Sequence, residues 1–210
     1  MIIIRDNKES LVDIRKVCPK ILVDIPEKIL KRYGALVRKT VAKMLNRAQR
    51  NLPTGLRLLV GEAWRPAWYQ KQIYEGFIKR FSKKYPKWSE KRVLEEVNKY
   101  VASWKGKYSS GHMSGGAVDV RIVDKNGRKI PMKSKKLNYQ ESAETYNKNL
   151  PPYIKRNRQI LIDAMRKAGF SNYPKEFWHW SYGDYWWAKR NKRKVAIYGA
   201  VDLKNAENDY

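Results

Sequence analysis

Apolar positions recur along the chain at two different spacings, which predict a mixture of helices and strands. Helical spacing predicts amphipathic helices over residues 27–51, 67–81, 89–104 and 155–170. Short runs rich in Leu, Val or aromatic residues predict strands at 56–64, 117–123 and 176–183. Because helices and strands do not alternate regularly, we expect an α+β fold, in one domain over residues 1–210, and not a doubly wound parallel sheet.

The segments between these elements carry loop and turn signals. Residues 108–116 (YSSGHMSGG) are small and predict a loop that leads directly into the strand at 117–123. DKNG at 124–127 predicts a turn after that strand. Residues 133–152 show no periodicity and are expected to be irregular.

The charge of the chain is strongly basic. It has 46 Lys and Arg against 20 Asp and Glu, a formal net charge of +26, spread along all 210 residues. Such a surface attracts polyanions, including nucleic acid and anionic cell-wall polymers. A non-catalytic protein that binds nucleic acid is therefore one functional hypothesis, and an ordinary solvated basic surface is the alternative.

Compartment signals are few. The single cysteine, Cys18, excludes an internal disulfide and a Cys-rich zinc site. No stretch is long and apolar enough to span a bilayer. The first residues lack the pattern of a cleaved signal peptide, so we expect a cytoplasmic protein.

The only two histidines, His112 and His179, stand in unusual local sequence. His112 lies in the small-residue loop, and Asp119 follows seven residues later inside the predicted strand. A loop of this kind can fold back so that the imidazole meets a carboxylate from the next strand. Together with His179 these residues form a common ligand set for catalytic zinc, which leaves the fourth position to water. We expect one zinc ion per chain.

Two further residues have the chemistry that a zinc hydrolase needs. Glu176 precedes His179 by three residues and can act as general base toward the water at the metal. If this segment is a strand, that spacing requires a bulge to bring both side chains to the site. Arg65 follows an apolar strand and can stabilise an oxyanion or bind a carboxylate. Each residue alone also fits an ordinary surface role, and on the residues alone both interpretations stay open.

The joint pattern resembles the D-alanyl-D-alanine dipeptidases, including the vancomycin-resistance type, within a wider group of zinc D,D-peptidases. The resemblance is carried by SGH at 110–112, by Gly115 to Asp119, by EFWH at 176–179 and by GEAWRP at 61–66. It spans about residues 35–200. The joint pattern is more specific than any of its pieces.

The resemblance implies a role for each matching residue. His112, Asp119 and His179 would be the zinc ligands and Glu176 the general base. Arg65 would stabilise the tetrahedral intermediate, and Ser110 would help to hold the substrate. The fold would have an antiparallel sheet behind the zinc. The substrate would be D-Ala-D-Ala or a similar short D-amino-acid peptide, and no specific nucleic acid would be bound.

One segment departs from the pattern of these dipeptidases. They show Phe-Asp after the metal-binding strand, and the carboxylate of that Asp meets the free ammonium of the substrate. Here Leu137 and Asn138 stand at that place, with Glu141 as a possible substitute. A neutral Asn binds an ammonium less strongly than a carboxylate does. A peptidase that trims peptidoglycan stem peptides, as a carboxypeptidase or endolysin, is therefore the alternative within the same group.

Overall fold

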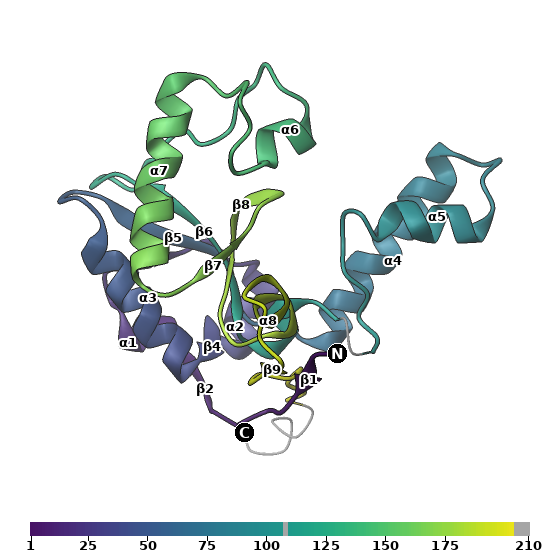
Figure 1. The fold of residues 1–210 in the computed structure, drawn as a ribbon, viewed down its shortest axis with the longest axis horizontal. Helices are drawn as coiled ribbons and strands as arrows, with labels where there is room; N and C mark the ends of the chain where they lie inside the picture. Colours follow the sequence, from purple (N-terminus) through teal and green to yellow (C-terminus); the bar gives the residue numbers. More distant parts are fainter. Residues whose placement is uncertain (107–108, 204–210) are drawn as a thin grey trace.

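The computed structural model describes residues 1–106 and 109–203, and its centre is a five-stranded sheet (Figure 1). The strand order is β3-β5-β6-β8-β7. The β3–β5 pair is parallel and the other three pairs are antiparallel, so the sheet is mixed and not wholly antiparallel. The bounds are β3 (Leu22–Val23), β5 (Arg57–Glu62), β6 (Ala117–Val123), β7 (Ser171–Tyr173) and β8 (Glu176–Ser181).

The main core lies between this sheet and the helices that pack on one of its faces. Helix α3 (Lys39–Asn51) packs beside α7 (Pro152–Lys167), and α1 (Ile14–Val17) packs against α3. Alternation along β6 puts Val118, Val120 and Ile122 into this core, so Asp119 points to the opposite face. Because side chains alternate between the two faces of a strand, the polar residues of β6 lie on the face opposite the core.

Two small sheets complete the body. Strand β2 (Leu11–Asp13) pairs with β4 (Leu36–Arg38), and β1 (Ile3–Ile4) pairs with β9 (Val195–Ala196), which brings the first strand beside the last. The prediction of one helix over 27–51 was wrong. Helix α2 (Glu27–Tyr33) ends at Gly34, whose positive φ of 75° stops the helix, and β4 follows before α3 begins.

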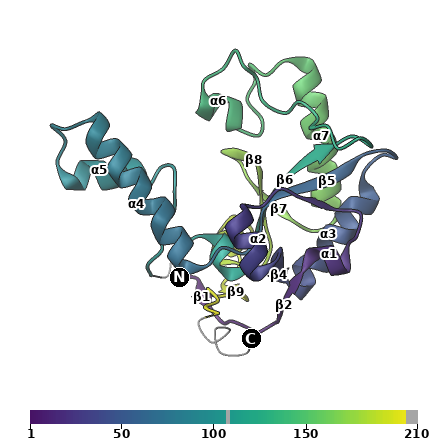
Figure 2. The same cartoon turned by 180° about the vertical axis from the view of Figure 1, so that it is seen from behind.

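A helical pair, here called the arm, projects from the body (Figures 1 and 2). It spans residues 67–101 and contains the two helices that the sequence predicted there, α4 (Ala67–Lys84) and α5 (Glu90–Val97). Val93, Val97 and Val101 form a small buried cluster of their own in the arm, separate from the main core. Helix α6 (Tyr139–Ala143) stands across from the arm and lies in the segment that the sequence predicted to be irregular.

The remaining elements are short. A 3-10 turn, η1 (Gly111–Ser114), occupies the middle of the predicted loop, whose first residue, 108, lies outside the described residues. Helix α8 (Tyr185–Arg190) follows β8. Strands β6 and β8 confirm the predicted strands at 117–123 and 176–183, and β5 confirms the one at 56–64. Within the described residues, no helix has the length and apolarity that a membrane span requires.

Candidate metal centre

Asp119 and His179 meet because of the register between two neighbouring strands. They are direct cross-strand partners in the antiparallel β6–β8 pair, and side chains opposite each other in such a pair lie on the same face. His179 Nδ1 lies 3.0 Å from Asp119 Oδ1. Backbone pairing of the two strands thus brings together two side chains that are 60 residues apart in the sequence.

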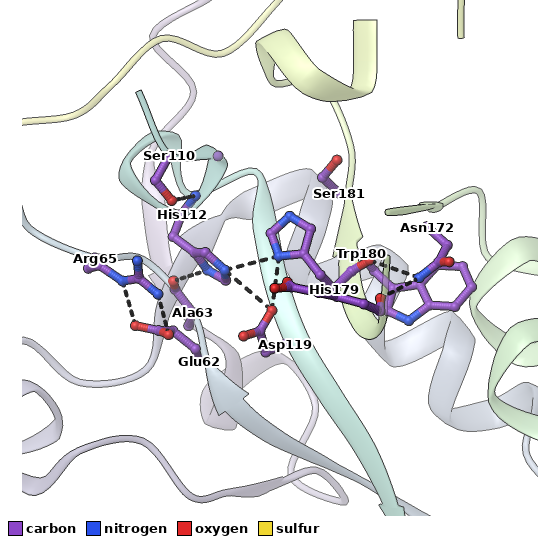
Figure 3. A network of polar contacts seen from close by, with 12 residues as sticks. Glu62, Ala63, Arg65, Ser110, His112, Asp119, Asn172, His179, Trp180 and Ser181 are labelled. Carbon is purple, nitrogen blue, oxygen red and sulfur yellow. Dashed lines mark hydrogen bonds and ion pairs between the residues drawn. The ribbon is translucent and has the colours of Figure 1, made fainter. Parts of the chain in front are cut away.

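His112 reaches the same point from η1. The turn begins at Ser110, whose hydroxyl accepts a hydrogen bond from His112 N, and it ends at Gly115 with a left-handed φ of 70°. A Cβ at Gly111 would lie 2.2 Å from Asp184 Oδ2, so only glycine fits there. His112 Nε2 lies 3.2 Å from His179 Nδ1 and 3.3 Å from Asp119 Oδ1 (Figure 3).

The three atoms form a nearly equilateral triangle with edges of 3.0, 3.2 and 3.3 Å. Zinc bound tetrahedrally at 2.0–2.1 Å places its ligand atoms about 3.3 Å apart. The three groups, whose ligand atoms lie within 4.8 Å of one another, therefore fit a zinc ion. The donor set, two imidazoles and one carboxylate, suits a catalytic site that keeps an open position.

The tautomer of His112 also fits a metal ligand. Its Nδ1 lies 3.0 Å from the carbonyl oxygen of Ala63. A carbonyl can only accept, so Nδ1 carries the hydrogen and the lone pair of a neutral His112 is on Nε2, facing the triangle. A backbone carbonyl that fixes the outer nitrogen in this way is typical of metal-binding histidines.

The electrostatics of the centre favour an ionised aspartate. Burial alone would raise the pKa of Asp119, but the charges and hydrogen bonds of His112 and His179 outweigh it and hold the pKa well below its ordinary value. Burial lowers the pKa of His112, while Asp119 raises it by more.

Glu176 is the first residue of β8, and the bulge that its spacing requires is present. In the β7–β8 pair, Asn172 is opposite Trp180 and the next residue, Tyr173, is opposite Glu176. One residue step along β7 therefore corresponds to four residue steps along β8, and the extra residues of β8 form the bulge. Burial raises the pKa of Glu176, and the neighbouring charge of His179 opposes this rise. The carboxylate is therefore within electrostatic reach of the candidate metal ligands.

The side chain of Asn172 holds this bulge, and its role was not predicted from the sequence. Asn172 Nδ2 donates to the carbonyl oxygens of Glu176 and His179, both at 3.0 Å. The hydroxyl of Thr145 donates to Asn172 Oδ1 at 2.7 Å, which fixes the orientation of the amide. Asn172 thereby links the backbone of the candidate base to that of a candidate ligand.

The side chain of Arg65 is 11% exposed, lies beside the triangle (Figure 3) and is oriented by two partners. Its Nε donates to Glu62 Oε1 at 2.6 Å, a second bond joins Nη2 to the same carboxylate, and Nη1 donates to Gln70. Burial lowers the pKa of Arg65, but the carboxylate of Glu62 raises it by more, so the guanidinium is charged. Glu62 pairs with Asp119 across β5 and β6, which places this cation at the metal-binding end of the sheet.

The residues that stand in place of Phe-Asp do not provide a free acid. Asn138 Oδ1 accepts from Glu141 N at 2.9 Å, and Glu141 Oε2 accepts from Asn138 N at 3.2 Å. This reciprocal pair is a capping box that begins α6. Both side chains are therefore engaged in holding the helix.

Comparison with known proteins identifies the family of the chain. Residues 12–195 match the profile of the family described as D-ala-D-ala dipeptidase. The match begins earlier in the chain than the expected range of about 35–200. The chain belongs to this family of peptidases. Among curated relatives, a D-alanyl-D-alanine dipeptidase of Synechocystis sp. is 33% identical over 109 residues, covering 43% of this chain and 44% of that protein.

A second relative, a D-alanyl-D-alanine dipeptidase of Escherichia coli, is 24% identical over 139 residues, covering 66% of this chain and 60% of that protein. The matches thus span about half the length of these relatives. Two solved structures are also similar. A vancomycin-resistance D,D-pentapeptidase VanY mutant with Zn(II) has a TM-score of 0.43 at 15% identity, covering 72% of this chain and 75% of that one. VanYB with D-alanine-D-alanine has a TM-score of 0.47 at 14% identity, covering 86% and 84%.

Proposed function

We propose that this protein is a zinc-dependent peptidase that hydrolyses the peptide bond of a D-Ala-D-Ala unit or of a similar short D-amino-acid peptide. The single observation that carries the proposal is the triangle of His112, Asp119 and His179, whose edges match a tetrahedral zinc site. Membership of the dipeptidase family supports the substrate class. It also argues against the non-catalytic, nucleic-acid-binding interpretation of the basic surface.

His112, Asp119 and His179 hold the metal in this proposal. A zinc ion bound there supplies Lewis-acid chemistry, which polarises the substrate carbonyl and makes water more acidic. Glu176 accepts the proton of the attacking water and then donates it to the leaving amine nitrogen. Its raised pKa suits both tasks, because a carboxylate that is too acidic is a weak base.

Arg65 stabilises the negative charge that develops on the carbonyl oxygen. Its orientation by Glu62 and Gln70 before substrate arrives means that little reorganisation is needed in the transition state. Ser110 holds the turn that carries His112, and we propose that its hydroxyl hydrogen also binds the substrate.

The proposal is tested by two measurements on one preparation. Metal analysis is expected to give about one zinc per chain, on the logic of one three-residue site. Hydrolysis of D-Ala-D-Ala and of peptides ending in it is expected with zinc, to be lost with a chelator, and to return when zinc is added back. Turnover that survives complete removal of the metal would contradict the proposal.

A further inference from the structure

A cleft runs from Glu176 to the arm. Its volume is about 780 Å³, and its lining includes Glu176 and Tyr173. The arm forms one wall, and α6 forms the facing wall, as their positions in Figure 1 suggest. This volume is near the upper end of the usual range for small-ligand sites, about 300–1,000 Å³. A two-residue peptide would fill only part of it.

The arm presents a row of aromatic rings to this cleft. Phe77 stacks on Tyr100 at 6.2 Å between ring centroids, Tyr100 lies 5.4 Å from Phe81, and Phe81 stacks on Tyr85 at 6.1 Å. All four residues line the cleft and are half-buried. On the facing wall, Tyr139 is 62% exposed. Such rings offer a large apolar contact area along the length of the cleft.

The acids that line the cleft, apart from Glu176, are already engaged. Glu96 pairs with Lys99 at 2.7 Å, Glu144 accepts from Asn147 at 3.0 Å, and Glu141 belongs to the capping box of α6. None of these three is therefore free to receive a substrate ammonium without breaking an existing contact. Because Glu176 is the proposed base, the described residues of the lining offer no unengaged carboxylate for a free amino terminus.

A cation, Lys133, lies beside Tyr139 at the edge of the cleft and is not itself part of the lining. Lys133 Nζ lies 4.4 Å from the ring centroid of Trp178 and 4.6 Å from that of Tyr139. Within the described part of the chain, no carboxylate lies within 4.0 Å of this ammonium, although Glu176 attracts it from farther away. A positive charge here repels a second ammonium.

We propose that this cleft is a binding site for the acylated, amino-terminal part of a longer peptide substrate, so that the enzyme cuts the end of an extended chain in preference to a free dipeptide. This inference rests on the proposed function for the identity of the scissile bond. The aromatic row and Tyr139 bind the extended chain from two sides. Lys133 disfavours a free amino terminus, and Arg80, Lys84 and Lys175 around the lining accept peptides that carry negative charge.

The first test compares two substrates on the zinc-loaded protein. An N-acetylated pentapeptide ending in D-Ala-D-Ala is expected to have a kcat/KM at least about tenfold above that of free D-Ala-D-Ala, since remote contacts contribute to the transition state. A dipeptide that is cleaved as efficiently as the pentapeptide would overturn the inference, while leaving the proposed function intact.

The second test uses variants on both walls with matched controls. Phe81→Leu keeps apolar volume in the arm but removes one ring of the row, and Tyr139→Ala removes the exposed ring opposite. Each is expected to lower the pentapeptide-to-dipeptide ratio of kcat/KM about three- to tenfold, the size of a lost aromatic contact. Tyr74→Leu on the same helix and Tyr153→Ala on α7 lie outside the cleft lining and should leave the ratio unchanged.

The third test separates binding from turnover. The Kd of the N-acetylated pentapeptide for the full chain is measured by calorimetry in a Glu176→Gln background, with and without Phe81→Leu or Tyr139→Ala. Weaker binding in both double variants supports the cleft even if no peptide is hydrolysed, in which case the proposed function alone fails. A Kd that neither substitution changes would overturn the inference.

Discussion

The candidate metal centre and the arm are held together by different physical means. The centre draws its groups from η1, β6 and β8, and the register of the main sheet and a buried turn bring them together. The arm is continuous in sequence, and its helices pack around three buried valines of their own. One region thus depends on contacts distant in sequence and the other on local ones.

This difference fits the two roles proposed for these regions, catalysis at the sheet and substrate binding at the arm. Proton transfer and metal binding need groups fixed to within a fraction of an ångström, and a sheet with a large core provides that rigidity. The arm, which we propose to bind an extended peptide, rests on a smaller core, where local opening costs less free energy.

The largest effect is expected from breaking the triangle itself. His179→Ala removes one of three ligands, so the zinc content should fall from about one per chain to near zero and hydrolysis should disappear. Zinc should raise the melting temperature of the wild type and not that of the variant, because only a folded site binds the ion. Full zinc occupancy in the variant after dialysis would show that His179 is not a ligand.

A smaller but still large effect is expected at the base. Glu176→Gln keeps the shape of the side chain and removes proton acceptance, so kcat should fall about 10²- to 10⁴-fold. Zinc content should stay near the wild-type value, which distinguishes a base from a ligand. The matched control is Glu144→Gln, another acid on the cleft lining, whose kcat for the dipeptide should be close to that of the wild type.

The contrast between the two regions also explains what the sequence could predict. Strand β6 was predicted with its correct bounds because its alternation is local, and the arm helices were found because their periodicity is local. The helix predicted over 27–51 was wrong because the apolar spacing continues through β4, and only the pairing of β4 with β2 makes that segment a strand. Tertiary pairing overrode the periodicity there.

The candidate site was predicted from residue chemistry and from family resemblance, while its supporting residues were not. The sequence showed His112, Asp119 and His179, and the structure brings them together. Asn172 carried no signal, because an asparagine before a Pro-Lys turn looks like any loop residue. Its side chain bridges the bulge by hydrogen bonds to two backbone carbonyl oxygens, and these contacts exist only in the folded structure.

Removing Asn172 should weaken the centre without removing a ligand. Asn172→Leu leaves the carbonyl oxygens of Glu176 and His179 without their donor, and loss of such supporting contacts typically costs about 10- to 100-fold in metal affinity or activity. The measurement is kcat/KM together with a zinc titration. Asn157→Leu, which removes an exposed amide bonded to Pro131, is the control. Equal kcat/KM and equal zinc affinity in the two variants would mean that the bulge keeps its geometry without the side chain of Asn172.

The smallest effect is expected in the arm, where it tests whether the two regions are energetically separate. Val97 is fully buried in the small cluster of the arm, and Val97→Ala removes two methyl groups, about 1–2 kcal/mol of buried apolar contact. Amide hydrogens of α4 and α5 should therefore exchange roughly tenfold faster, while those of β6 and β8 keep their rates and their protection by zinc. Val120→Ala, in the main core, should instead accelerate exchange in the sheet. If Val97→Ala speeds exchange equally in the sheet and in the arm, the two regions unfold as one unit, and the arm does not move independently of the metal centre.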